Sequence, residues 1–124
     1  MELTINDKVY NFKAGMGFLR KANKLVTKKV DGTKKEKEIG MAVLAAGLID
    51  GDVEDLLTVL NLTNEGQDPR VTMTELEGYI EDENTDIDTL FESVLDFLSS
   101  ANVCKKTIAN LVERIAEQQV KTQA

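Results

Sequence analysis

Residues 82–88, which read Asp-Glu-Asn-Thr-Asp-Ile-Asp, are the stretch of this chain with the clearest capacity for chemistry. Oxygen-bearing side chains stand at the first, third, fifth and seventh positions, as they do in an EF-hand calcium loop. That loop also requires glycine at its sixth position and glutamate at its twelfth, where this chain has Ile87 and Ser93. Capping and helix-dipole effects at a helix N-terminus account for the same acidic residues. We therefore expect no metal site and keep a calcium-binding module as an alternative.

Other reactive side chains are few. The chain has no histidine, and Cys104 is its single cysteine, so neither a His-containing zinc site nor an imidazole-activated thiol is available. We expect Cys104 to be a small packed apolar residue. Carboxylate pairs such as Glu81 and Glu83 are typical of a solvated surface, and Gly-Met-Gly at 15–17 lacks the third glycine of a dinucleotide-binding loop. We predict no catalytic residue, no cofactor and no enzymatic activity.

Charge is distributed unevenly along the chain. The first 38 residues hold ten of the fifteen Lys and Arg residues and five acidic ones, a local balance of +5. The remainder holds five basic and seventeen acidic residues, a balance of −12, and the two sum to the net charge of −7. This asymmetry predicts a basic N-terminal part joined to an acidic part, and it favours binding over catalysis.

Composition also bears on the compartment. A single cysteine suits a reducing environment, and residues 1–7 lack the charged and apolar regions of a signal peptide. No apolar run approaches the roughly 20 residues that cross a bilayer. We expect a cytoplasmic protein with no membrane contact.

The N-terminal part is expected to combine a hairpin with a basic helix. Residues 2–5 and 8–12 have strand-like composition on either side of Asn6-Asp7, a turn sequence. A helix over about 14–29 has apolar residues at helical spacing beside five basic ones, and we expect it to cover the hairpin. Residues 30–38 contain one apolar residue and an Asp-Gly turn signal, which predicts an exposed connection.

From residue 39 onward the pattern is helical. Asp52 is placed to cap a second helix in this part, and Thr72 with Glu75 forms a capping box for the next one. Thr85 is expected to cap the clearest helix, 86–99, whose apolar residues recur at i, i+3, i+4, i+7, i+8 and i+11. The pattern predicts an α+β, predominantly helical fold, with the N-terminal β-hairpin packed against a bundle of about five or six helices. We expect one domain over 1–124, divided into 1–29 (hairpin and basic helix), 30–38 (exposed connection), 39–120 (acidic helical part) and 121–124 (frayed tail).

Two features leave alternatives open. The basic helix could bind nucleic acid, with Tyr10, Phe12 and Phe18 as stacking faces, but the net charge opposes this and we favour a hairpin–helix interface for these aromatics. The last helix, about 103–120, has one apolar face, which either packs on its own domain or is covered by a partner. Its apolar residues are Ile108, Leu111, Val112 and Ile115.

The order of the segments carries a family resemblance. The opening Leu-Thr-Ile-Asn-Asp-Lys-Val-Tyr-Asn-Phe-Lys at 3–13 is followed at once by Gly-Met-Gly-Phe-Leu-Arg-Lys-Ala-Asn at 15–23. Later come Gly-Asp-Val-Glu-Asp-Leu at 51–56 and Asp-Ile-Asp-Thr-Leu-Phe-Glu-Ser-Val-Leu-Asp-Phe-Leu at 86–98. In this combination and order, the chain resembles the tail assembly chaperones of long-tailed phages and prophages of Gram-positive bacteria.

The resemblance implies a protein that acts before the virion is complete and is absent from the mature particle. Members of this family are implied to bind the long, aggregation-prone tape measure protein, to hold it soluble and extended in the host bacterial cytoplasm, and to help recruit tail tube subunits. The family commonly makes a longer form by translational frameshifting, which implies a further partner.

Opposite charges at the two ends of the chain suggest a homo-oligomer in which a basic part meets an acidic part. The candidate partner or self-association surface comprises Arg20, Lys21, Lys24, Lys28, Asp86, Asp88, Leu111 and Ile115.

Overall fold

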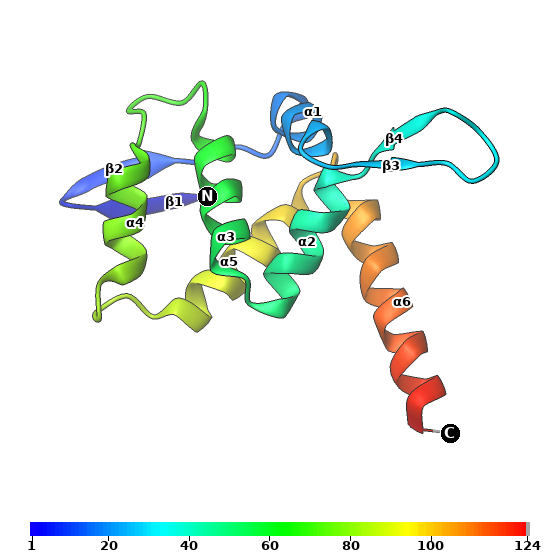
Figure 1. The fold of residues 1–124 in the computed structure, drawn as a ribbon. Coiled ribbons are helices and arrows are strands. Elements are labelled where there is room, and N and C mark those ends of the chain that lie inside the picture. Colours follow the sequence, from blue (N-terminus) through cyan, green and yellow to red (C-terminus); the bar gives the residue numbers. More distant parts are fainter. Residues whose placement is uncertain (124) are drawn as a thin grey trace.

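Six helices and two small antiparallel hairpins make up the part of the chain that the structure describes. The computed structural model describes the backbone of residues 1–123 and the side chains of residues 1–119. This confirms the α+β, predominantly helical fold with an N-terminal hairpin (Figure 1). In chain order the elements are β1 (Glu2–Ile5), β2 (Lys8–Asn11), α1 (Met16–Lys24), β3 (Thr27–Lys29), β4 (Glu36–Glu38), α2 (Gly40–Asp50), α3 (Val53–Asn64), α4 (Met73–Glu81), α5 (Ile87–Ser100) and α6 (Lys105–Gln123).

The first hairpin turns at Asn6 and Asp7, whose φ angles of 52° and 65° suit a tight turn between twisted strands. Its buried face carries Ile5 and Tyr10, each 2% exposed. Among the helices, α4 makes the most extensive approach to β1, and the Tyr10 hydroxyl donates a hydrogen bond of 2.7 Å to Glu75 Oε2 on α4. The helix that we expected to cover the hairpin, α1, packs instead on α2 and α3.

A second hairpin replaces the end of the expected N-terminal helix and the expected connection. Helix α1 ends at Lys24, and β3 and β4 pair in the register Thr27↔Glu38, Lys28↔Lys37 and Lys29↔Glu36. The β-branched residues before and within β3 favour a strand, and Gly32 supplies the positive φ of 76° that the turn needs. Residues 27–38 therefore form a projecting arm, so the prediction of a helix to residue 29 is wrong (Figure 1).

Close approach of α1 and α2 depends on glycine. A Cβ built on Gly40 would lie 1.7 Å from the carbonyl oxygen of Ala22, a backbone atom that cannot swing aside. Next to it, the Met41 backbone N–H donates to Asn23 Oδ1 at 3.0 Å. Helix α2 then ends at Gly51, whose φ of 79° forms a left-handed C-cap. The core of the domain is centred on α1 and α2 together with α3 and α5.

Asn64, at the end of α3, is fully buried and links three segments of backbone. Its Nδ2 donates to the Asn11 carbonyl at 2.9 Å and to the Pro69 carbonyl at 3.3 Å. Its Oδ1 accepts from the Val71 N–H at 2.7 Å and from Arg70 Nη1 at 2.9 Å. This one amide holds β2, α3 and the loop before α4 together, with every polar atom partnered.

The two caps expected in the second half of the chain have different outcomes. The capping box of Thr72 and Glu75 is confirmed. Helix α5 is capped by Asp86, whose Oδ1 accepts from the Thr89 N–H at 3.1 Å, and not by Thr85. An N-cap side chain reaches the amide three residues ahead, and because α5 begins at Ile87, Thr85 lies one position too early. Thr85 instead donates to the Tyr79 carbonyl at 2.6 Å.

Helix α6 is attached by its first turns only. Cys104, just before it, is fully buried and Ile108 is 3% exposed, and both belong to the core formed with α2 and α5. Beyond them the helix leaves the body, as Figure 1 shows. The beginning of the apolar face thus packs on its own domain, while Leu111 and Ile115 are half-buried and Val112 is 50% exposed. The last helix, expected to end at about residue 120 before a frayed tail, continues to Gln123, and residue 124 of that tail lies outside the described residues.

Candidate interaction surfaces

In the acidic segment 82–88, the carboxylates of Asp82 and Asp86 accept hydrogen bonds from nearby backbone N–H groups. The Asp82 Oδ1 accepts from the Asn84 N–H at 2.9 Å, and the Asp86 carboxylate caps α5. Hydrogen bonds from Thr89 hold the pKa of Asp86 below its ordinary value, because they favour the ionised carboxylate. Among the described residues, no group of three or more His, Cys, Asp or Glu side chains is placed to hold a metal ion. These contacts support the capping interpretation over the calcium alternative.

Cys104 has the properties of a core residue. Its side chain is buried with Sγ 3.8 Å from Met41 Sδ, and burial raises the pKa of the thiol to about 11. The thiol is therefore protonated at neutral pH and is a poor nucleophile. Tyr10, Phe12 and Phe18 are also buried, at 2%, 3% and 4% exposed, which removes them as stacking faces for nucleic acid and confirms a structural role.

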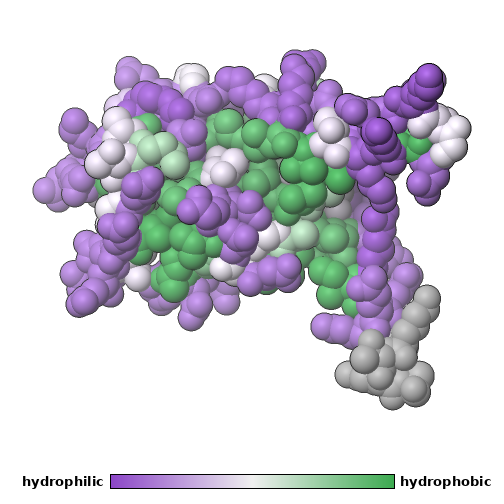
Figure 2. All heavy atoms as spheres, in the orientation of Figure 1, coloured by the Kyte–Doolittle hydropathy of each residue, from purple (hydrophilic) through white to green (hydrophobic). Residues whose placement is uncertain are grey.

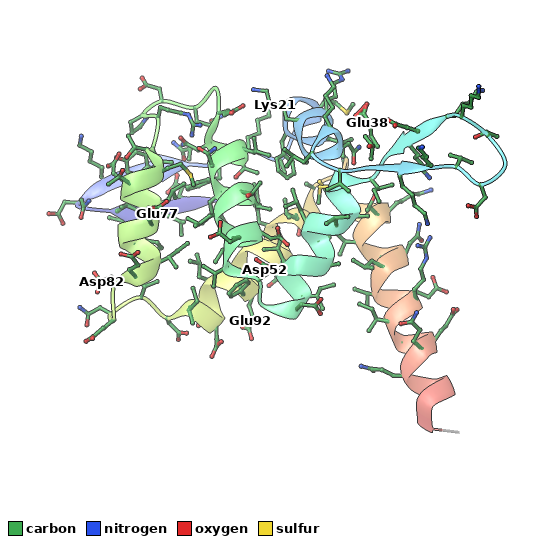
Figure 3. The ribbon with its side chains drawn as sticks, in the orientation of Figure 1. Lys21, Glu38, Asp52, Glu77, Asp82 and Glu92 are labelled. Atoms are coloured by element: carbon green, nitrogen blue, oxygen red, sulfur yellow. The ribbon has the colours of Figure 1, made fainter. Side chains whose placement is uncertain are left out.

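The basic residues expected to form one surface are divided by the structure. Lys21 forms an ion pair with Glu65, on the side of α1 that faces the loop after α3 (Figure 3 labels Lys21). Arg20 and Lys24 face the arm instead and line a hollow of about 540 Å³ between α1 and the arm. The remaining lining residues of this hollow are Asn23, Val30, Lys35, Glu36, Lys37 and Glu38.

An acidic hollow lies at the opposite end of the molecule. It also measures about 540 Å³ and is formed by the turn of the first hairpin, α4 and the turn before α5. Three of its lining residues, Glu75, Asp82 and Asp86, are acidic and none is basic. The hydrogen bond from Tyr10 lowers the pKa of Glu75, with further bonds from Thr72 acting in the same direction. The hollow is therefore anionic at neutral pH.

Asp88, which we grouped with Asp86, faces a different part of the molecule. It lines a separate hollow of about 440 Å³ between α2 and α5, beside Phe91 and Leu95. The two carboxylates lie on either side of the N-terminus of α5 because they are two positions apart on the helix. The structure thus brings Asp86 together with Asp82 and Glu75, and not with Asp88.

A groove runs between α2 and the projecting part of α6. It has a volume of about 360 Å³, and its lining combines the apolar residues Ile39, Ala42 and Leu111 with the neutral polar residues Asn23, Thr107 and Asn110. Lys37, Glu38 and Arg114 form the charged part of that lining. Sequence reasoning found Leu111 but missed the groove, because β4 and α6 are about seventy residues apart in the chain and no local pattern shows that they meet.

Apolar surface is gathered on the face of the molecule shown in Figure 2. Apolar residues form a band across the middle of this face and reach the inner side of α6, while hydrophilic residues surround the band. Val43 on α2 and Val53 at the start of α3 are 38% and 42% exposed. An exposed apolar band bordered by polar residues is typical of a surface that binds other polypeptides.

None of the helices among the described residues combines the length and apolarity needed to cross a bilayer. In the same part of the chain, the surface has shallow hollows and a groove, the thiol is buried, and no side-chain cluster is placed to bind a metal ion.

Comparison with known proteins agrees with this description. The family model described as phage tail assembly chaperone protein, TAC, matches residues 2–113, from β1 to the middle of α6. No curated protein and no solved structure gives a significant match. Because the family match covers both hairpins, five whole helices and the packed part of the sixth, the chain belongs to the phage tail assembly chaperone family.

Proposed function

We propose that this protein binds the tape measure protein during tail morphogenesis, keeps it soluble, and helps to recruit tail tube subunits to it. The observation that supports this most is the projecting part of α6. Leu111 and Ile115, one helical turn apart, remain half-buried after the domain has folded, and Leu111 lines the groove between α2 and α6. A protein that covers apolar segments of a client reversibly needs such a face.

The shape of the groove suits a helical segment. Helices α2 and α6 border it together with the ends of α1 and β4, and its lining holds apolar residues beside charges of both signs. An amphipathic helix binds in such a groove through apolar residues at i, i+3, i+4 and i+7, and rim charges orient it. The net charge of −7 keeps a loaded complex in solution.

Family membership supports the wider setting of the proposal. The protein acts without catalysis in the host bacterial cytoplasm, and it is released before the virion is mature. A longer frameshifted form shares this fold and adds a segment that engages the tape measure protein. Tail tube subunits join the complex of the chaperone with its client.

Coexpression with the tape measure protein tests the proposal. The variant Leu111→Asp/Ile115→Asp places two charges on the groove side of α6, and Ala109→Asp/Ala116→Asp places two on exposed positions of the same helix. We expect the client to stay in the soluble fraction with the wild type and the control variant, and to sediment with the groove variant. Circular dichroism checks that both variants are folded.

Soluble client in equal amounts with the groove variant and the wild type would contradict the proposal.

Recruitment of tail tube subunits is tested by a separate experiment. Tail tube subunits should be captured by the immobilised complex of chaperone and client, and capture of equal amounts by the client alone would show that the chaperone has no part in recruitment.

A further inference from the structure

The hollow between α2 and α5 is a second apolar surface, separate from the groove beside α6. Its volume is about 440 Å³, and its apolar lining comprises Leu48 and Ile49 in the last turn of α2 and Phe91 and Leu95 on α5. None of these four residues lines the groove. Leu48 is buried, but the other three remain half-buried, so the folded domain leaves part of their apolar surface in contact with solvent.

The end of α2 leaves this hollow open and gives it a negative potential. Gly51 lines the hollow with a φ of 79°, and no atom lies within 4 Å of the position that a Cβ would take there. The C-terminal end of a helix carries a partial negative charge, and α2 has no basic residue in its last turn. A cationic group of a partner would therefore be stabilised at this end of the hollow.

The charged side chains that line the hollow are both acidic. Asp88 and Glu92 are exposed and lie one turn apart on α5. Two more exposed carboxylates, Asp50 and Asp52, stand on either side of Gly51 in the chain. Figure 3 shows Glu92 near the turn between α2 and α3, where Asp52 lies. Carboxylates thus border the hollow on the α5 side and at the end of α2.

Basic residues that would neutralise these carboxylates are scarce in this part of the chain. Arg70 is the only Lys or Arg within residues 39–104, and its guanidinium bonds to Asn61 and Asn64 towards the other end of α3. The two ion pairs found among the described residues both involve Glu65. Within the described structure, the carboxylates at the hollow therefore have no salt bridge.

Spacing along α5 indicates the shape of an occupant. Phe91 and Leu95 are one turn apart, and Asp88 and Glu92 form a neighbouring row with the same spacing. A helix that binds between two others presents apolar residues at i, i+3, i+4 and i+7 to both of them. Basic residues one turn apart on such a helix would lie along the row of carboxylates. The two rows on α5 therefore match the two faces of an amphipathic, basic helix.

We propose that the hollow between α2 and α5 binds a cationic amphipathic helix of another protein. Its apolar residues contact Phe91 and Leu95, and its Lys or Arg side chains pair with Asp88 and Glu92. The charges distinguish this site from the groove beside α6, whose lining carries charges of both signs. Because the two sites share no lining residue, this proposal stands or falls separately from the proposed function.

Three synthetic peptides probe the site. The lysine peptide has leucine at i, i+3, i+4 and i+7 and lysine at its other positions, and the glutamate peptide has the same leucines with glutamate in place of lysine. The alternating peptide has the composition of the lysine peptide but alternates leucine with lysine, which is a strand pattern. Fluorescence anisotropy of dye-bearing peptides with the full chain, at about 0.15 M salt, measures each Kd.

The first variant, Asp88→Asn/Glu92→Gln, removes the two carboxylates that line the hollow. Its matched control, Glu77→Gln/Glu81→Gln, removes two exposed carboxylates one turn apart on α4, away from the hollow. We expect the Kd of the lysine peptide to rise about tenfold with the first variant and to stay at the wild-type value with the control. Equal weakening by both variants would show attraction to net charge alone and would overturn the proposal.

The second variant, Phe91→Ala, removes apolar surface from the hollow without changing its charge. Its control is Phe97→Ala, a half-buried position on the same helix that does not line the hollow. Circular dichroism checks that both variants are folded. We expect weaker binding of the lysine peptide with Phe91→Ala only, and equal Kd values for the two variants would contradict the site. If either variant fails to fold, the charge variants still decide the question.

The wild type should bind the lysine peptide more tightly than the glutamate and alternating peptides. Equal binding of either of these two peptides would overturn the proposal, because the site would then select neither charge nor helical pattern. A second copy of this chain is the competing occupant. Light scattering should give both hollow variants the mass of the wild type, and a lower mass would show that the hollow is a contact between copies, which would also overturn the proposal.

Discussion

The body of the molecule, which comprises the first hairpin, α1–α5 and the first turns of α6, contrasts with its two projections, which are the arm and the rest of α6. The contrast lies in how far their side chains are buried and hydrogen-bonded. In the body, Asn64 has a partner for each polar atom, and Leu56, Leu60 and Leu76 are fully buried. In the arm every strand residue is exposed, and on α6 the apolar face extends past the core. We therefore infer that stability resides in the body and propose that binding of the client resides in the projections. Substitutions in the core of the body should change the free energy of unfolding, and substitutions in the projections should change binding of the client.

The largest expected effect is at the contact of α1 with α2. Gly40→Ala places a Cβ on the Ala22 carbonyl, so the helices must move apart, and we expect the free energy of unfolding to fall by about 3 kcal/mol. The matched control is Gly78→Ala in α4, where no atom lies within 4 Å of the new Cβ. Because alanine favours the helical backbone more than glycine does, the free energy of unfolding of this control should rise by about 1 kcal/mol. Urea unfolding of the two variants measures both changes, and equal stability would contradict the described packing.

A smaller loss of stability is expected when the buried side-chain amide of Asn64 is removed. Asn64→Ala leaves the Val71 N–H and the Asn11 carbonyl without partners, and we expect a loss of about 2 kcal/mol. The exposed Asn110→Ala on α6 is the control and should change stability by less than about 0.5 kcal/mol. If both variants unfold at the same urea concentration, Asn64 does not link β2 to the loop before α4.

The smallest effect in the body depends on pH. Partial burial raises the pKa of Asp55, and the charges of Asp52 and Glu54 raise it further. A carboxyl whose pKa is higher in the folded state stabilises the fold below its unfolded value of 3.8, and this stability is lost as pH rises through the folded pKa. Asp55→Asn should therefore have the melting temperature of the wild type near pH 3 and a higher one at pH 7.

Thermal unfolding followed by circular dichroism at several pH values measures this difference. Asp96→Asn, at an exposed position in the middle of α5, controls for the loss of one negative charge. A difference between wild type and Asp55→Asn that stays constant with pH, or that matches the control, would show that Asp55 is not destabilised by its surroundings.

Sequence patterns predicted the body better than the projections. Helix α5 was predicted within one residue because six apolar residues at helical spacing mark one face. The capping box at Thr72 was predicted because it involves residues three apart. The arm was missed because Leu25 and Val26 continue the helical spacing of α1, and three-residue strands carry too little pattern to compete with it.

Contacts between distant residues account for the remaining misses. The Tyr10 to Glu75 bond joins residues 65 positions apart, and no spacing rule indicates it. Likewise, Asp86 and Asp88 look like one acidic site in the sequence, but the helix directs them into different hollows. Leu111 and Ile115 on α6 were found because their spacing is local, whereas the groove that Leu111 lines depends on the placement of α2.

Hydrogen exchange of the chaperone with and without the tape measure protein tests the central claim most directly. If binding resides in the projecting part of α6 and the groove beside α2, backbone amides over residues 39–46 and 107–119 should gain protection on addition of the client, while those of α4 and the first hairpin should not change. Protection confined to α4 and the first hairpin, with α6 unaffected, would contradict the account.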